Sequence, residues 1–563
     1  MMARCVGAGV SQMLGIAETS YFSVQVDDAN AASLNITLTA LTGNPNLYVT
    51  LLPLNRSMLP SDAQWKSEQY GSDFVTISKP EPLKTYSILV LASSNLPTFF
   101  TLSASWGASL VELSDGHPVD GSIPQSTTKS YSFRIGRKIA QPNFNPDLIV
   151  TLSARFGDVS MFLSNDASKP IIPSNNATYQ YSTLGNARLR GTLIVPAANV
   201  ETKTYRLLVQ ANSNANYTLS YSYAMPSVLA FGKPFTAHVN GGEYRYFTFT
   251  TDNTDPVQIV ISSLSENPDV YYRKDGNLPN TTYFEDRSLG QPTQPYNLLV
   301  IPHGQPGVEY VVAVYGQPER PSLFSISVTS SFLYLAMGVS QTVSSAQQSL
   351  FFFDVDISTA KPDVFIQISA ASSDVYQLYV INTYTTPTVA NAVWSTRTTG
   401  ASTFIIPGND PKYCPASDYC GAFYVAVVPV TVTSQYFTIT TATASSMTLL
   451  GPNSDLPSSV VTVGSYRMFQ LPVASADNFT LVLETCSGNA DMFGSNNYVQ
   501  NVEPSKDRFT LESTRSRELD YFKYSGGSTG SALYVAVYGQ KATETNLVWF
   551  KIHSRIGSLY ART

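Results

Sequence analysis

The chain has 563 residues, which is too many for one hydrophobic core and predicts four or five domains of ~100–150 residues each. Charged residues make up 13% of it against a usual ~25%, while 43% of the residues are hydrophobic and 12% are aromatic, so the composition indicates a folded protein rather than a disordered one. The net charge of −6 argues against nucleic acid as a partner, and no apolar run is long enough to span a membrane.

Internal repetition is the strongest pattern in the sequence. The string VAVYGQ occurs at Val312–Gln317 and at Val535–Gln540, 223 residues apart. The string GVSQ occurs at Gly9–Gln12 and at Gly338–Gln341, 329 residues apart. Two periods fit the first offset and three fit the second, so both indicate a repeat of about 110 residues.

A third pattern occurs five times in phase with these strings. It has Asn, Asp or Ser at its first and third positions, then an aliphatic residue or Met, then an aromatic residue. We call it the Asx word, and its copies are at 44–48, 158–162, 267–271, 372–376 and 489–493. Asn and Asp side chains hydrogen-bond to nearby backbone, so each copy predicts a tight turn before a strand.

Each repeat contains the same segments in the same order. The first is an aromatic-rich alternating stretch, at 21–22, 131–133, 246–247, 351–353 and 466–469. A β-rich run follows, as at 34–42, 148–153 and 257–262. After the Asx word and a polar loop comes a short apolar stretch, as at 193–196, 298–302 and 404–407. A late strand is predicted at 86–91, 205–209, 310–315, 424–428 and 534–538, and a closing alternating strand at 99–105, 217–223 and 324–329.

These segments predict an all-β protein. They are short, rich in Val, Ile, Thr, Tyr and Phe, and bounded by Gly, Pro, Asn and Asp, and no helix of 12 or more residues is evident. About seven strands per repeat fit five tandem jelly-roll or immunoglobulin-like β-sandwiches in an elongated array. The predicted domains are 1–108, 109–223, 224–332, 333–446 and 447–563, joined by short polar junctions and expected to pack end to end.

The Asx word followed by a late Tyr-x-x-x-Val strand resembles the bacterial pre-peptidase C-terminal domain, whose signature is of the type Gly-Asp-x-Asp-Leu-Tyr-Val. Acidic positions of that signature are matched by Asp158, Asp269, Asp374 and Asp491, whereas Asn46 and Ser160 depart from it. The resemblance covers all five repeats. It implies a small jelly-roll-like sandwich in a secreted protein, of a kind that commonly accompanies peptidases, aids substrate binding and can bind calcium.

Those four carboxylates are therefore candidate calcium ligands, because calcium is bound by several oxygen atoms. One carboxylate per loop is too few unless backbone carbonyls or distant Asp residues join it. The alternative is that each carboxylate caps its turn by accepting backbone hydrogen bonds. No other cofactor is indicated.

The cysteines and glycosylation signals bear on the compartment. Cys414 and Cys420 are spaced for a short disulfide loop, which would add about 2.4 kcal/mol by loop entropy, whereas Cys486 is expected to be a buried thiol and Cys5 lies too far along the chain to pair with it. The sequence has six Asn-x-Ser/Thr signals, at Asn35, Asn55, Asn176, Asn216, Asn280 and Asn478. Chance predicts about that number, so they carry no information about secretion.

Catalytic patterns are scarce. The four His residues fall in different repeats. Gly526–Gly530 matches the Gly-x-Ser-x-Gly pattern of a catalytic serine, but a strand is expected after it where that site requires a helix. A second candidate site is a cluster of exposed aromatic side chains that could bind a ligand, namely Tyr271, Tyr272 and Tyr283 in one hairpin of the third repeat. The alternative is that these residues are ordinary strand residues, since aromatic residues are common in strands.

The leading hypothesis is a non-enzymatic extracellular or cell-surface array that acts as a structural stalk or adhesive module, with an extracellular protein or polysaccharide as partner. The Gly9 string already belongs to a repeat junction, so no room for a signal peptide is visible and a truncated chain is expected. The alternative is the accessory substrate-binding region of a secreted peptidase whose catalytic domain lies outside this chain. A surface-layer subunit is a third option.

Overall fold

The computed structural model describes residues 4–5 and 10–556 with internal gaps. The gaps are 52–57, 70, 94–96, 107–109, 138–146, 184–190, 224, 264–265, 291–295, 319–320, 331, 358–360, 384, 415–420, 445, 451–454, 473–477, 496–503, 508, 515–518, 526–531 and 542–546. Within the described ranges the chain is all-β, and the only helices are 3-10 turns of three residues: η1 (Pro60–Asp62), η2 (Asn176–Thr178) and η4 (Ala197–Asn199).

The strands fall into five units of nine. Unit 1 has β1 (Arg4–Cys5), β2 (Val10–Leu14), β3 (Thr19–Gln25), β4 (Ser33–Thr42), β5 (Pro45–Thr50), β6 (Trp65–Ser67), β7 (Asp73–Ser78), β8 (Thr85–Ala92) and β9 (Thr98–Trp106). Unit 2 has β10 (Val111–Glu112), β11 (Val119–Ile123), β12 (Thr128–Arg134), β13 (Leu148–Phe156), β14 (Val159–Ser164), β15 (Tyr181–Ser182), β16 (Thr192–Val195), β17 (Thr204–Ala211) and β18 (Ala215–Ser222). Unit 3 has β19 (Ser227–Val228), β20 (Phe235–Val239), β21 (Tyr244–Thr250), β22 (Val257–Ser263), β23 (Asp269–Arg273), β24 (Asp286–Ser288), β25 (Tyr296–Ile301), β26 (Glu309–Tyr315) and β27 (Ser322–Thr329).

Units 4 and 5 follow the same plan. Unit 4 has β28 (Phe332–Tyr334), β29 (Gln341–Ser344), β30 (Ser349–Asp354), β31 (Val364–Ser369), β32 (Val375–Ile381), β33 (Trp394–Thr399), β34 (Ser402–Ile406), β35 (Ala422–Thr431) and β36 (Tyr436–Thr443). Unit 5 has β37 (Thr448–Leu449), β38 (Asp455–Thr462), β39 (Tyr466–Pro472), β40 (Asn478–Ser487), β41 (Asn489–Ser495), β42 (Leu511–Ser513), β43 (Leu519–Ser525), β44 (Ala532–Lys541) and β45 (Leu547–Ile556).

All five units share one sheet topology. In unit 1 a five-stranded sheet runs β1-β3-β8-β5-β6 and a four-stranded sheet runs β2-β9-β4-β7, and the other four units repeat both orders strand for strand. The first and third strands of each unit pair in parallel, and the remaining ladders are antiparallel. The predicted all-β class and tandem sandwich repeats are confirmed. Each unit has nine strands rather than about seven, because its first and sixth strands, most of them only two or three residues long, are too short to show alternation.

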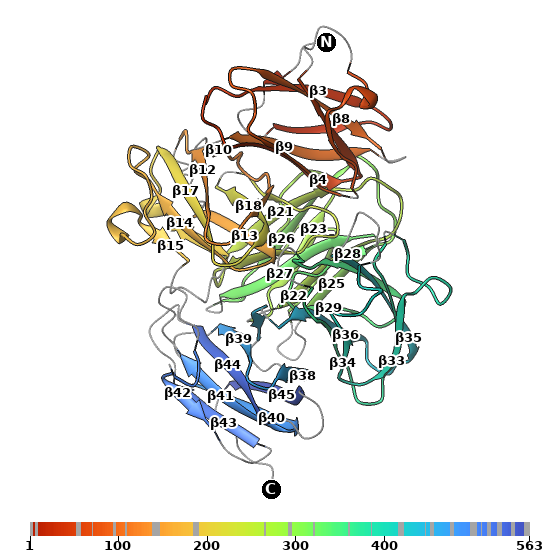
Figure 1. The fold of residues 1–563 in the computed structure, drawn as a ribbon. Coiled ribbons are helices and arrows are strands. Elements are labelled where there is room, and N and C mark those ends of the chain that lie inside the picture. Colours follow the sequence, from red (N-terminus) through yellow and green to blue (C-terminus); the bar gives the residue numbers. More distant parts are fainter. Residues whose placement is uncertain are drawn as a thin grey trace.

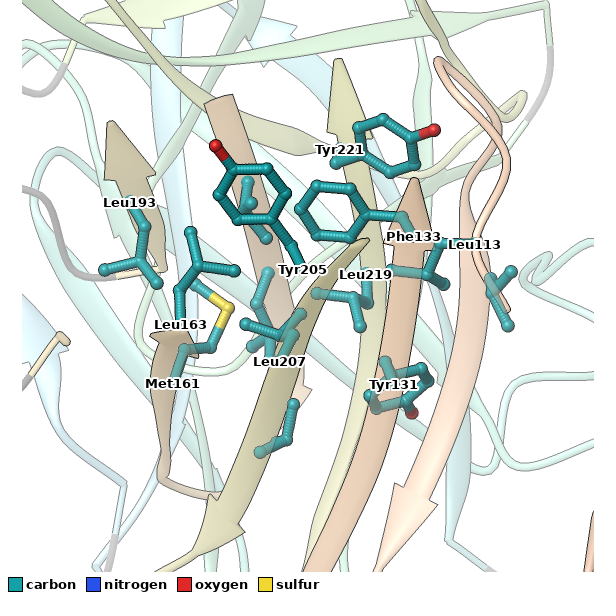
Figure 2. Close-up of a cluster of buried hydrophobic side chains, with 14 of the residues drawn as sticks. Leu113, Tyr131, Phe133, Met161, Leu163, Leu193, Tyr205, Leu207, Leu219 and Tyr221 are labelled. Carbon is teal, nitrogen blue, oxygen red and sulfur yellow. The ribbon is translucent and has the colours of Figure 1, made fainter. Parts of the chain in front are cut away.

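Each unit has its own core between the two sheets. In unit 2 the core includes Tyr131, Phe133, Tyr205, Leu207 and Leu219, which Figure 2 shows converging from neighbouring strands. The rings of Phe133 and Tyr205 stack at 5.3 Å between centroids. Inward residues alternate with outward ones along these strands, so the local sequence specifies which side chains enter the core of each sandwich.

The units do not touch only their immediate neighbours. Units 1 and 5 lie at opposite ends of the molecule, and units 2, 3 and 4 lie between them (Figure 1). The backbone N–H of Phe231 in unit 3 donates to the carbonyl of Leu41 in unit 1 (2.8 Å), and the N–H of Met337 in unit 4 donates to the carbonyl of Arg155 in unit 2 (2.8 Å). The expectation of simple end-to-end packing is therefore corrected, since next-but-one units also meet.

Candidate functional site at the junctions between units

The four predicted calcium ligands lie in four different units. Asp158, Asp269, Asp374 and Asp491 each lie at or next to the start of the fifth strand of their unit, where the Asx word places them. Among the described residues no group of three or more His, Cys, Asp or Glu side chains could hold a metal ion. The structure thus does not bring these carboxylates together.

Two of these carboxylates tie the turn before the fifth strand to the turn between the eighth and ninth strands. Asp374 is buried and accepts hydrogen bonds from Thr433 N (2.7 Å) and Thr433 Oγ1 (2.8 Å), and from Ser434 N (3.3 Å). Burial alone would raise the pKa of Asp374, but these donors outweigh it and lower the pKa. Asp158 accepts from Asn212 Nδ2 (3.1 Å) in the equivalent place. Both carboxylates thus accept hydrogen bonds from a distant turn rather than from the backbone of their own word, so the turn-capping alternative stays a prediction.

The other two carboxylates have different surroundings. Asp269 accepts from Gly290 N (2.8 Å) and from the hydroxyl of Tyr271 (3.3 Å). Asp491 is buried beside Asp520, and burial, followed by the charge of Asp520, raises the pKa of Asp491 to about 6. Among the described residues Asp491 Oδ1 is buried with no hydrogen-bond partner, so this carboxylate carries an electrostatic cost.

The tyrosine cluster of unit 3 is not a surface platform. Tyr271 and Tyr272 are adjacent on β23, so they point to opposite faces, and both are buried. Only Tyr283 is exposed, at 45%, with the guanidinium of Arg273 3.5 Å from its ring centroid. The expectation of exposed rings is wrong for Tyr271 and Tyr272, whose rings are used for packing, and ligand binding at this hairpin stays a prediction.

The remaining predicted sites are scattered. Cys414 packs against the core of unit 4, while Cys420 lies outside the described residues, so their disulfide stays a prediction. Cys486 is exposed, which corrects the expectation of a buried thiol. Of the glycosylation signals, Asn176 is exposed; Asn35, Asn216 and Asn280 are half-buried; Asn55 and the side chain of Asn478 lie outside the described residues.

What the sequence analysis did not anticipate is a repeating contact between successive units. The four-stranded sheet of one unit supports the second strand of the next, through β4 with β11, β13 with β20, β22 with β29 and β31 with β38. The same hydrogen bond forms at three junctions: Asp120 N to Thr39 Oγ1 (2.8 Å), Thr236 N to Ser153 Oγ (3.1 Å) and Thr342 N to Ser262 Oγ (3.0 Å). Each hydroxyl lies five residues before the Asx word, so this recurrence was available as a sequence signal.

The later junctions vary this contact. Between units 4 and 5 the amide of Gln367 donates to Ser459 Oγ (2.7 Å). On unit 5 itself the equivalent position is Glu484, which lies 3.7 Å from Lys551 Nζ and 3.6 Å from His553 Nε2. The outer face of the unit 5 sheet is therefore charged where the faces of units 1 to 3 present hydroxyls.

Three equivalent glycines form a second recurring contact. The carbonyls of Gly116, Gly232 and Gly338 accept the N–H groups of Val228, Tyr334 and Leu449, each from the first strand of the next unit. Each glycine has a positive φ of 72 to 78°. A Cβ added to them would lie 2.4, 2.6 and 2.0 Å from a carbonyl oxygen of the approaching unit. Glycine is required here by backbone conformation and by close approach together.

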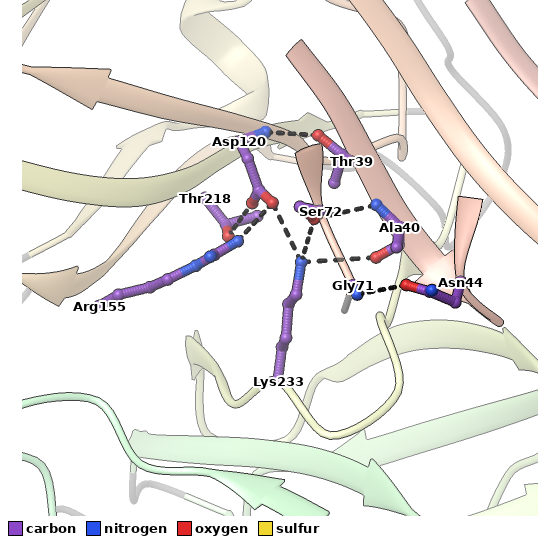
Figure 3. A network of polar contacts seen from close by, with 9 residues as sticks. All are labelled: Thr39, Ala40, Asn44, Gly71, Ser72, Asp120, Arg155, Thr218 and Lys233. Carbon is purple, nitrogen blue, oxygen red and sulfur yellow. Dashed lines mark hydrogen bonds and ion pairs between the residues drawn. The ribbon is translucent and has the colours of Figure 1, made fainter. Parts of the chain in front are cut away.

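A buried charged cluster lies where three units meet (Figure 3). Asp120 of unit 2 is 1% exposed and pairs with Arg155 of the same unit and with Lys233 of unit 3, whose Nζ lies 3.0 Å from Asp120 Oδ2. Lys233 Nζ also donates to Ser72 Oγ (2.8 Å) and to the carbonyl of Ala40 (3.4 Å), both in unit 1. One ammonium thereby joins three units.

The cluster stabilises the ionised carboxylate of Asp120, although burial lowers the pKa of Lys233 to about 8. Burial alone would raise the pKa of Asp120, but Arg155 and Lys233 lower it well below its usual range. The hydroxyl of Thr218 adds a further hydrogen bond to the same carboxylate. A buried pair of this kind contributes more to the choice of one arrangement than to net stability, since desolvation opposes the Coulomb gain.

Two cavities flank this cluster. Each has a volume of about 480 Å³, and both are lined in part by Arg155, Phe156 and Lys233. The first draws its walls from units 1 to 4, and the second from units 2 to 5. Cavities of this size between domains are typical places for small ligands.

Comparisons with known proteins do not assign the chain to a family. No family model matches it, and no curated protein matches it. Among solved structures, a protein from Parabacteroides distasonis described as secreted is 8% identical over 39% of this chain and 81% of its own length, with a TM-score of 0.11. An α-L-rhamnosidase from Streptomyces avermitilis is 11% identical (80% and 58% covered, TM-score 0.11), and an α-2-macroglobulin from Escherichia coli is 9% identical (99% and 49% covered, TM-score 0.11). Likenesses at these TM-scores carry no argument about this chain.

Proposed function

We propose that the chain is a non-enzymatic extracellular or cell-surface array that serves as a structural stalk and presents adhesive surfaces. The observation that carries the proposal is the repeated junction: a hydroxyl contact and a glycine contact recur between units, and Lys233 joins three units. Interfaces that repeat in kind give a stiff body rather than a flexible string of domains. A stiff body holds binding surfaces at defined spacings, so weak contacts can add through effective concentration.

The extracellular address rests on the resemblance to secreted pre-peptidase C-terminal modules and on the predicted Cys414–Cys420 bridge, which would persist only in an oxidising compartment. Within the described ranges, no helix is long and apolar enough to cross a membrane. The partner is an extracellular protein or polysaccharide.

Two measurements test the proposal. Antibodies against the recombinant chain should label intact, unpermeabilised cells of the source organism, and labelling only after permeabilisation would refute the address. Small-angle scattering of the full chain should fit one rigid particle with the contacts of Figure 1. A profile that requires freely moving domains would refute the stiff stalk.

A further inference from the structure

One wall of the first cavity carries both aromatic and acidic side chains. It is formed by the outer face of the five-stranded sheet of unit 4. Side chains alternate along β30, so Phe351 and Phe353 enter the core of the unit while Phe352 and Asp354 point outward. Asp356, two residues further on, also lines the cavity. The wall therefore carries aromatic rings and carboxylates side by side.

Neighbouring strands complete the aromatic part of this wall. Phe352 lies opposite Tyr424 of β35 in the ladder, and Phe332 comes from β28 on the other side of β30. The rings of Phe352 and Tyr424 are close to parallel, at 6.0 Å and 17°, whereas Phe332 stands at 78° to Tyr424 with centroids 5.6 Å apart. These three rings form a corner with walls at nearly right angles, and all three line the cavity.

Carboxylates outnumber cations among the described residues that line the cavity. Asp252, Asp354 and Asp356 line it, against the two cations Arg155 and Lys233. Both cations already contact Asp120, which is buried behind them. Burial raises the pKa of Asp354, and Arg155 offsets that only in part. Burial likewise raises the pKa of Asp252. An added positive charge would therefore be stabilised in this cavity.

We propose that this cavity binds an organic ammonium group, held against the ring corner of Phe332, Phe352 and Tyr424 and neutralised by Asp354 and Asp356. Ring faces attract cations, and the attraction grows when water is excluded. A bare metal ion fits poorly, because phenyl rings supply no ligand atoms and the described residues contain no cluster of three metal-binding side chains. The head group can belong to a free small molecule or to a methylated lysine of a partner chain, and both present the same chemistry.

The test is isothermal titration calorimetry on the full chain, with choline as the probe. The matched ligand is the uncharged isostere of choline, in which carbon replaces nitrogen. We expect choline to bind at least about tenfold more tightly than the isostere, because only the charged ligand gains from the rings and carboxylates. Equal affinity for choline and the isostere would show that the cavity does not recognise the positive charge, and it would overturn the proposal. The absence of choline binding would overturn it as well. This comparison uses the unmodified protein, so it does not depend on whether a variant folds.

Variants locate the site. Asp354→Asn and Phe352→Leu should each weaken choline binding by about tenfold. Asp286→Asn, at an exposed carboxylate on β24 of unit 3, should leave it unchanged. Choline binding that survives both cavity variants would place the site elsewhere and overturn the proposal. A peptide that contains trimethyllysine distinguishes the two sources: binding of the peptide supports a partner side chain, and binding of choline alone supports a free ligand. If neither choline nor the peptide binds, the ammonium site is refuted, while the proposed stalk function is unaffected.

Discussion

The glycine contact at the junction between units 4 and 5 gives the sharpest prediction. Gly338 has φ of +76°, and a Cβ placed on it would lie 2.0 Å from the carbonyl oxygen of Met447 in the next unit. Gly242 is a matched control, because its φ is +79° and a Cβ there would meet nothing within 4 Å. Gly338→Ala and Gly242→Ala thus share the backbone strain and differ only in the collision with the neighbouring unit.

The magnitudes follow from these two geometries. The shared strain of an alanine in the left-handed region costs about 1–2 kcal/mol. For Gly338→Ala the backbone of unit 5 must also move away, which adds about 1–3 kcal/mol for overpacking. It also weakens the hydrogen bond from Leu449 N to the Gly338 carbonyl (2.8 Å), at a further cost of about 1 kcal/mol or more if the N–H stays buried. Gly338→Ala should therefore lower the unfolding free energy by at least about 2 kcal/mol more than Gly242→Ala does.

Differential scanning calorimetry of the full chain can measure the difference. For a unit of this size, about 2 kcal/mol corresponds to a Tm shift of about 8 °C or more in the affected transition. Small-angle scattering of Gly338→Ala should in addition show unit 5 displaced, whereas Gly242→Ala should match the unmodified chain. Equal Tm shifts for the two variants would refute the reasoning, since they would show that the close approach of the units has no energetic weight.

Three further outcomes are expected. Lys233→Met should lower the unfolding free energy by about 3 kcal/mol in urea titrations, because it leaves a buried carboxylate with fewer partners. Lys203→Met, at an exposed pair, should leave the unfolding free energy nearly unchanged. Burial raises the folded pKa of Asp491 to about 6, so the stability that its protonation contributes is present at acid pH and lost as the pH rises through about 6. Asp491→Asn should therefore raise the unfolding free energy by about 1–2 kcal/mol over the unmodified chain at pH 7.5, and by little at pH 4. Burial likewise raises the pKa of Asp73 to about 6, but the Asp73 oxygens accept three hydrogen bonds that an amide cannot all keep. Asp73→Asn should therefore destabilise the chain at pH 7.5, and a gain there would contradict the argument. Millimolar calcium should leave every calorimetric transition unmoved, because the predicted ligands lie in separate units, and a calcium-dependent rise in Tm would restore the metal hypothesis.

The sequence by itself determined the unit and its strands. The run predicted at 34–42 is β4 (Ser33–Thr42), and the late strand predicted at 310–315 is β26 (Glu309–Tyr315). These elements follow from local patterns, since alternation and branched or aromatic side chains specify a half-buried strand without reference to distant residues. The Asx word also predicted the place of the turn before the fifth strand, because Asn and Asp favour tight turns.

The packing between units was decided only by the tertiary structure. Asp120 and Lys233 are 113 positions apart, and each looks like an ordinary surface charge in its own segment. The outward faces of Phe352 and Asp354 likewise carry no local sign that units 1 to 3 close over them. Tyr271 and Tyr272 show the converse, since residues that read as a ligand platform are buried by their own unit. Alternation tells which side of a strand faces inward, but what covers the outer side depends on how whole units fit together, and that is set by contacts between residues far apart in the chain.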